Sequence, residues 1–195
     1  MRFNIMIRGT NAILLHKYTV ASASTPKTRV IKNKDSVNYA DEWVKGTYLD
    51  KDGNVVMPSL NIMACLFDGC KGMKSGKKAL TRIIYTSLLV QPFEPVLTYE
   101  GKTISIDTIR ENDWLNMSGA VITGRRVDRV RTMIPEGWEL PFQITQKDES
   151  LSADDIKMIV ENAGIAAGLG DWRPSSPKKP GAYGTFELVK MEPVK

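Results

Sequence analysis

The segment AGIAAGLGDWRPSSPKKPGAYGTFEL, residues 163–188, carries the end of a helix, a long loop and the start of a strand. Its first residues are small and apolar and predict a helix. Gly168 and Gly170 predict the end of that helix, because glycine readily adopts positive φ. A tract rich in proline and lysine follows, and an alternating, strand-like pattern covers 183–191. We therefore predict a long, basic, glycine-bounded loop between the last helix and the last strand.

Outward from this segment, the preceding helix is expected to begin at Ser152, whose side chain can cap it. Asp154 and Asp155 complement the dipole of its first turn. Near the N-terminus, residues 2–8 alternate apolar and polar side chains, which is typical of a half-buried strand, and 9–34 reads as a loop. The other predicted elements are a short helix at 35–45, a hairpin at 47–57, a helix with Ser59 as N-cap, a strand at 82–90, a hairpin around Glu100 and Gly101, a long strand at 120–134 and a strand at 139–145.

Without the hairpins, the order of elements is strand, helix, strand, strand, helix, strand. This βαββαβ order is typical of a ferredoxin-like or RRM-like core. The sequence therefore predicts an α+β fold with inserted β-hairpins and long loops. We expect one domain over 1–195, with 10–57 and 71–118 as insertions into its core.

The composition is that of a globular protein with a basic surface. Of the 195 residues, 42% are hydrophobic and 25% are charged, and the net charge is +5. Positive charge is segregated: residues 1–34 contain seven Lys and Arg and no acid, and 71–82 contain five and no acid. Segregated positive charge favours anionic partners.

The cysteine pattern and the hydropathy favour the cytoplasm. Cys65 and Cys70 lie five residues apart in a predicted helix and point to different faces, so a disulfide between them is not expected. The first apolar stretch lacks the features of a secretory signal. The longest apolar run, 83–90, is too short to span a bilayer, so no membrane association is expected.

Enzyme signatures were tested and do not fit. His16 is the sole histidine, and it has no partner at metal-ligand spacing. No G-x-S-x-G motif occurs. GMKSGKKA, residues 72–79, is one residue short of a phosphate-binding loop and has Lys78 in place of its hydroxyl residue. GLGDWR follows a helix rather than opening one, so dinucleotide binding is not indicated. We expect no catalytic residue, no metal and no cofactor.

Four basic stretches carry the functional prediction, although the common role of any one lysine run is a solvated surface. Alternation along a strand places Arg125, Arg129 and Arg131 on one face, where a row of guanidinium groups can follow phosphates. Arg173 beside Trp172 suits single-stranded nucleic acid, because bases stack on aromatic rings. Trp172 fits a core anchor equally well. The predicted nucleic-acid-binding residues are Lys17, Lys71, Lys74, Lys77, Lys78, Arg82, Arg125, Arg126, Arg129, Arg131, Trp172, Arg173, Lys178 and Lys179.

Three stretches resemble the RAMP superfamily, the RRM-fold proteins that form RNA-binding subunits of CRISPR effector complexes in antiviral defence. They are the C-terminal GLGDWRPSSPKKPGAYGTFEL, the opening FNIMIRG, and VMPSLNIMACL at the entry to the first helix. The C-terminal stretch is also similar to the ending of certain phage proteins. The family's usual basic residue between the last two glycines is absent here, where Ala182 and Tyr183 stand. The lone histidine gives no support for RNA cleavage, so the resemblance implies binding.

The resulting hypothesis is a non-catalytic protein that binds single-stranded nucleic acid, with RNA favoured over DNA. The resemblance implies protein partners or self-association in a nucleoprotein complex or filament. The alternative is a phage-encoded protein-interaction factor, anti-defence or virion-associated, that has no nucleic-acid ligand. That alternative predicts an exposed apolar patch and association that is insensitive to salt.

Overall fold

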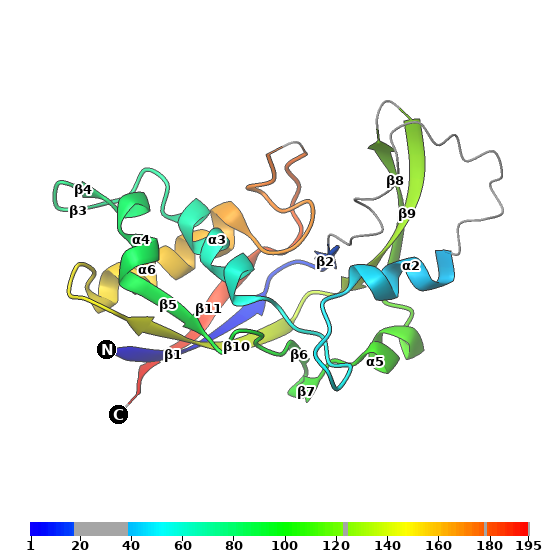
Figure 1. Cartoon of the computed structure of the whole chain (residues 1–195), viewed down its shortest axis with the longest axis horizontal. Helices are drawn as coiled ribbons and strands as arrows, with labels where there is room; N and C mark the ends of the chain where they lie inside the picture. Colours follow the sequence, from blue (N-terminus) through cyan, green and yellow to red (C-terminus); the bar gives the residue numbers. More distant parts are fainter. Residues whose placement is uncertain (18–38, 123–124, 178, 195) are drawn as a thin grey trace.

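The structure is a computed structural model that describes residues 1–17, 39–122, 125–177 and 179–194, with the backbone alone described for 39–42, 120–122 and 125–128. It is an α+β protein built from antiparallel sheets and a few helices (Figure 1), as the sequence predicts at the level of fold class. Among the described residues, no helix has the length and apolar character needed to cross a membrane.

The main sheet is built around three long strands, and every pairing in it is antiparallel. β1 (Arg2–Gly9) lies between β11 (Phe186–Pro193) and β10 (Trp138–Gln146). The other edge of β10 pairs with β5 (Leu88–Gln91) at one end and with β6 (Thr98–Tyr99) at the other. β6 pairs in turn with β7, residues 102–103. The predicted strands at 2–8 and 139–145 and the hairpin around Glu100–Gly101 are thus confirmed.

Alternation of side chains along these strands decides where the core lies. Phe3, Ile5 and Ile7 of β1 are buried, and the residues between them face outward. Two helices, α3 (Ser59–Gly69) and α6 (Ala153–Asn162), lie over the buried face (Figure 1). The opposite face carries side chains such as Arg2, Asn4, Gln143 and Lys190 and lines a shallow, open hollow.

A second sheet, of order β2-β9-β8, extends from one end of the molecule (Figure 1). β9 (Arg125–Ile134) pairs with β2 (Ile13–Leu15) at its base and with β8 (Leu115–Ile122) along its length. We call the β8–β9 hairpin the arm. The predicted single strand at 120–134 is therefore wrong. Ile122 and Arg125 are the paired ends of two antiparallel strands, so the predicted strand joins the end of β8 to the whole of β9.

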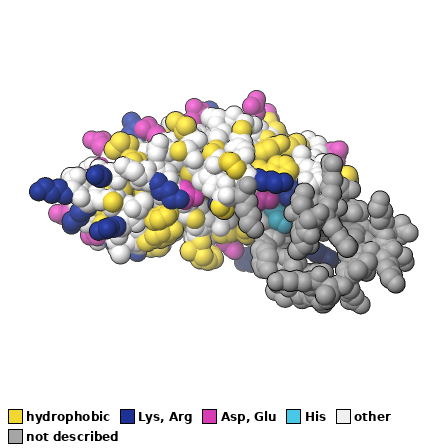
Figure 2. All heavy atoms as spheres, turned by 90° about the horizontal axis from the view of Figure 1, so that it is seen from above, with side chains coloured by type: hydrophobic (Ala, Val, Ile, Leu, Met, Phe, Trp, Pro, Cys, Tyr) yellow, Lys and Arg dark blue, Asp and Glu magenta, His cyan; other side chains and the backbone are white. Residues whose placement is uncertain are grey.

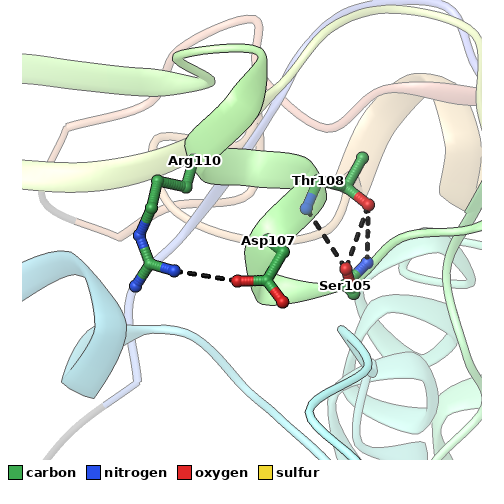
Figure 3. Close-up of polar contacts among 4 residues, drawn as sticks. All are labelled: Ser105, Asp107, Thr108 and Arg110. Carbon is green, nitrogen blue, oxygen red and sulfur yellow. Dashed lines mark hydrogen bonds and ion pairs between the residues drawn. The ribbon is translucent and has the colours of Figure 1, made fainter.

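Two helices support the base of the arm. α2 (Tyr39–Gly46) packs against β9, and the buried hydroxyls of Thr47 and Thr132 lie 2.7 Å apart. α5 (Ile106–Glu111) begins with a capping box in which Ser105 and Thr108 bond each other's backbone N–H, and Arg110 pairs with Asp107 at 2.8 Å (Figure 3). The Arg110 guanidinium also lies 5.9 Å from the ring centre of buried Trp43 in α2.

Other expected elements differ from the structure. Ser59 is the first residue of α3 and forms no side-chain cap; Pro58 is the capping residue. Only the end of the predicted strand at 82–90 is extended, because the preceding residues form the 3-10 helix η2 (Leu80–Arg82) and the short α4 (Ile84–Ser87). The basic stretch before it folds into a small hairpin of β3 (Lys74–Ser75) and β4 (Lys78–Ala79). β5 belongs to the main sheet, although it lies inside the predicted insertion 71–118.

The start of α6 agrees with the sequence. The Ser152 hydroxyl accepts a hydrogen bond from the Asp155 N–H at 3.1 Å, and the Asp155 carboxylate accepts one from the Ser152 N–H at 2.9 Å. After ten residues the helix widens into a π-helical turn, η3 (Ala163–Ala167), which packs against α3. η3 ends at Gly168, the first residue of the long glycine-bounded loop.

We expect Ser152→Ala to lower the free energy of unfolding by about 1 kcal/mol, because it removes the acceptor that caps α6. Ser150→Ala is the matched control, since Ser150 is exposed and precedes the cap. Urea denaturation followed by circular dichroism measures both. Equal stability of the two variants would contradict a stabilising role for the cap.

Candidate nucleic-acid interface

The loop after η3 is closed by backbone hydrogen bonds and held against β2. The Leu169 N–H donates to the Gly184 carbonyl, and the Gly184 N–H donates to the Ala12 carbonyl, at 2.9 and 2.8 Å. The Asp171 N–H donates to the Leu14 carbonyl at 2.8 Å. Gly170 and Gly184 have φ values of 78° and 69°, and a Cβ atom on either would collide with the backbone of Leu14 or Leu169. The close approach that requires these glycines is therefore made by the protein's own backbone.

Arg131 connects the arm to this loop. Its guanidinium donates to the Asp171 carboxylate at 3.1 Å and to the Ser118 hydroxyl at 3.0 Å. It also lies 5.0 Å from the ring centre of Trp172. The Arg131 side chain is only 6% exposed, so its charge is enclosed by these partners. This arginine, predicted to hold phosphate, is engaged inside the protein.

Trp172 is packed against the protein and is also partly exposed, so it fits both the core-anchor role and the base-stacking role that the sequence allowed. Its indole is half-buried against Arg131 and lies 6.2 Å from the Tyr183 ring, which is how an anchor of the loop would pack. Its φ of 51° is unusual for a residue with a side chain, and it places Trp172 at a sharp turn beside Arg173. Part of the indole and the Tyr183 ring still reach solvent.

The rest of the basic strand follows the arm outward. Arg129 and Arg131 are two residues apart on β9 and therefore share one face of the strand. Arg129 is half-buried and stands opposite Ser118 across the hairpin. The side chains of Arg125 and Arg126 lie outside the described part of the chain.

Arg173, unlike Arg131, keeps its charge available to a ligand. Its Nε donates to the Ser175 hydroxyl at 3.0 Å and its Nη1 donates to the Gly170 carbonyl at 3.1 Å. These two bonds fix the orientation of the guanidinium and leave three of its five N–H donors unused. Among the described side chains, no carboxylate forms an ion pair with it.

A pocket of about 160 Å³ lies beside Arg173. We call it the α3–loop pocket, because α3 and the loop 168–173 form its two sides. His16 at the end of β2, Tyr48, and Asn61 of α3 contribute its polar groups together with Asp171 and Arg173. Lys17 follows His16, and its ammonium lies 5.9 Å from the Tyr48 ring centre. The other lining residues are Leu15, Met57, Ala64, Cys65, Gly168, Leu169 and Gly170.

Of the four basic stretches, the structure brings together residues of three: Lys17 of the first, Arg129 and Arg131 of the arm, and Trp172 and Arg173 of the loop. Residues 18–34 of the first stretch lie outside the described part of the chain. The structure does not bring in the fourth stretch. The β3–β4 hairpin, with exposed Lys74, Lys77 and Lys78, lies at the opposite end of the molecule from the arm (Figure 1). Lys71 there pairs with Asp68 at 2.6 Å, and Arg82 is exposed. Lys179 is exposed on the loop, and Lys178 lies outside the described residues.

The distribution of charge on the surface agrees with this separation. Figure 2 shows Lys and Arg side chains at several separate places, one of them the end that carries β3 and β4, with hydrophobic and uncharged atoms between them. The candidate interface is therefore the region around the α3–loop pocket. His16, Tyr48 and Asn61 belong to it although sequence reasoning did not select them. They come from three separate segments, and only the fold brings them together.

The described residues contain no cluster of three or more His, Cys, Asp and Glu side chains that could hold a metal ion. Cys65 and Cys70 are both free and buried. Burial raises the pKa of the Cys65 thiol to about 12, although the nearby Arg173 charge acts in the opposite direction. Burial also raises the pKa of the Cys70 thiol.

Comparison with known proteins does not place the chain in a family. No protein-family model matches the sequence, and a search of curated proteins found no relative.

A double-mutant cycle tests the link between the arm and the loop. We expect Arg131→Ala to cost about 2 kcal/mol of unfolding free energy, because it removes a buried charged donor from partly buried partners. Arg131→Ala and Asp171→Ala should be coupled by about 1 kcal/mol or more. The exposed pair Lys157 and Glu161, 3.9 Å apart, is the control and should show a coupling of roughly 0.3 kcal/mol. Additive effects for Arg131 and Asp171 would contradict the link.

The cysteines offer a second test. We expect neither thiol of the native protein to react with DTNB at about pH 8, because buried, protonated thiols are poor nucleophiles. Both should react after denaturation. The folded protein keeps the Cys65 proton to higher pH than the unfolded chain does. The stabilisation from this group is therefore complete below pH 9 and is lost as the pH rises from 9 toward 12. Rapid labelling of the native protein would contradict this.

Proposed function

We propose that this protein binds single-stranded nucleic acid, with RNA favoured over DNA, and performs no catalysis. The observation that carries the proposal is Arg173, a half-buried, oriented guanidinium without a carboxylate partner among the described residues. A partly desolvated guanidinium in that position is further stabilised by an anion that accepts its remaining N–H donors. The phosphate of a nucleic acid provides such an anion and accepts hydrogen bonds from arginine.

The surroundings of Arg173 suit an unpaired strand. Lys17 and Arg129 lie on the two segments that flank the loop and add positive charge, which attracts a phosphate backbone in a salt-dependent way. Tyr48, Trp172 and Tyr183 are half-buried rings within the same region and offer surfaces on which bases can stack. Lys179 extends the basic surface along the loop.

The arrangement of strands and helices supports a ferredoxin-like core, which is part of this proposal. Taken as β1, α3, β5, β10, α6 and β11, the elements follow the βαββαβ order, and the strands lie side by side as β11-β1-β10-β5. Many RNA-binding modules use a core of this type. Membership of the RAMP superfamily, with several copies along one strand or within a larger complex, is the extension that the resemblance implies.

The exposed face of the main sheet is a poor candidate for the interface. Charges of both signs alternate on it, with ion pairs between Arg8 and Glu139 and between Lys190 and Glu192. RRM proteins stack bases on aromatic residues of this face. In this protein the hollow on that face is lined by side chains such as Asn4, Met6, Gln91 and Pro141, which offer no aromatic ring. Phe142 also lines the hollow, but its ring is buried. The region around Arg173 is therefore preferred.

The second candidate function is protein binding. Leu60 and Phe93 are 66% and 65% exposed, and the Ser59 N–H bonds the Phe93 carbonyl, so two exposed apolar side chains lie near one another at the start of α3. Such a pair suits a partner protein better than a phosphate backbone. In either case the free cysteines fit a reducing compartment such as the cytoplasm.

Fluorescence anisotropy with a labelled single-stranded octanucleotide tests the proposal. We expect binding that weakens strongly between about 50 and 200 mM salt, because phosphate contacts release counterions. Arg173→Ala should weaken binding by about five- to tenfold, the loss of one charged contact to phosphate. Lys157→Ala, an exposed lysine of α6, is the control and should bind like the unmodified protein. Absence of binding at low salt would refute the proposal, and salt-insensitive capture of a discrete protein would favour the second candidate.

A further inference from the structure

The α3–loop pocket has the chemistry of a site for one small, partly charged, planar group. Its floor and walls include the apolar side chains of Met57, Ala64 and Leu169. Its polar groups come from separate segments, an arrangement that is typical of sites that fix the orientation of a ligand.

The size of the pocket limits what can enter it. Pockets for drug-sized ligands hold about 300–1,000 Å³. The α3–loop pocket holds about 160 Å³. It therefore accommodates a single heterocyclic ring system and excludes two stacked bases or a folded strand.

The charged side chains around the pocket favour an anion at Arg173 and not at Asp171. Asp171 also lines the pocket, but its carboxylate is already paired with Arg131 at 3.1 Å. Arg173 lacks such a partner among the described residues and keeps three N–H donors. A phosphate group at Arg173 would be neutralised, and its attached base would reach the apolar part of the pocket.

Asn61 supplies a group that can recognise a base edge. Its Nδ2 lies 3.7 Å from the Met57 sulfur, a weak acceptor, so the amide retains donor and acceptor capacity toward the pocket. A side-chain amide of this kind can bond a base in a bidentate manner, as asparagine does with adenine. His16 and the Tyr48 ring border the same space.

We propose that the α3–loop pocket binds one nucleotide of the strand, with its base between Met57, Ala64 and Leu169, its edge on Asn61 and its phosphate on Arg173. This inference rests on the proposed function and adds to it that one base is drawn out of the strand. Binding then depends on the presence of a base as well as on the charge of the backbone.

The test compares a single-stranded octanucleotide with an abasic strand of equal length and charge, using the whole 195-residue chain at low salt. We expect the abasic strand to bind about tenfold more weakly, since one base contact of this kind is typically worth about 1–3 kcal/mol. Ala64→Leu fills the pocket from α3 and should reduce the difference between the strands to about twofold. Leu60→Ala, an exposed residue one turn earlier on α3, is the matched control and should keep the tenfold difference.

Asn61→Ala is a second test that does not depend on filling the pocket, because it removes only the side-chain amide. It should also reduce the preference for the base-containing strand. Thermal unfolding verifies that each variant is folded. Equal binding of the two strands by the unmodified protein would overturn the inference while leaving the proposed function intact. An unchanged preference in both Ala64→Leu and Asn61→Ala would overturn it as well. Failure of either strand to bind would overturn the proposed function, and the nucleotide pocket with it.

Discussion

The ion pair between Arg131 and Asp171 is the constraint on which the arrangement of the interface depends. A guanidinium that is 6% exposed needs partners, because an unpaired charge at that depth would be strongly destabilising. Its three partners come from two places: Asp171 and Trp172 of the last loop, and Ser118 of β8. The same Asp171 bonds the backbone of β2 through its N–H. One buried charge thus holds the arm, the loop and the second sheet in a common position.

This constraint separates two arginines that look alike in the sequence. Arg131 sits in a basic strand and Arg173 in a basic loop, and both were expected to contact nucleic acid, Arg131 at phosphates and Arg173 at bases beside Trp172. The structure encloses the first and leaves the second oriented but without a carboxylate partner among the described residues. Arg131 is therefore a scaffold residue, and Arg173 is the one placed to meet an anion. The difference arises from Asp171, whose proximity to Arg131 across 40 positions is a product of the fold.

Elements with strong local patterns could be predicted from the sequence. The alternation in β1 and β10 and the capping residues of α6 depend on neighbours along the chain, and each appears where it was expected. The reversal between β8 and β9 was missed, because strand-forming residues such as Val121 and Val127 stand on both sides of it in the sequence. α5 also escaped prediction, since its six residues are too few to show a helical period.

The residues of the candidate site could likewise be predicted only where their signal is local in the sequence. Trp172, Arg173 and Lys17 were selected because charge and aromatic character are visible in the sequence. His16, Tyr48 and Asn61 were not, because each is unremarkable in its own segment and the pocket exists only where β2, α3 and the loop meet. The lysines of the β3–β4 hairpin form an equally basic stretch, yet the fold places them at the far end of the molecule. Local composition alone does not separate the two groups.

Photochemical cross-linking of a 4-thiouridine-containing strand, followed by mass spectrometry of the linked peptides, tests the central claim most directly. The account predicts links in two peptides: the one that carries Tyr48, which lines the α3–loop pocket, and the one that carries Trp172, which lies in the last loop. Links confined to the peptide that carries Tyr85, an exposed ring near the β3–β4 end, would contradict it.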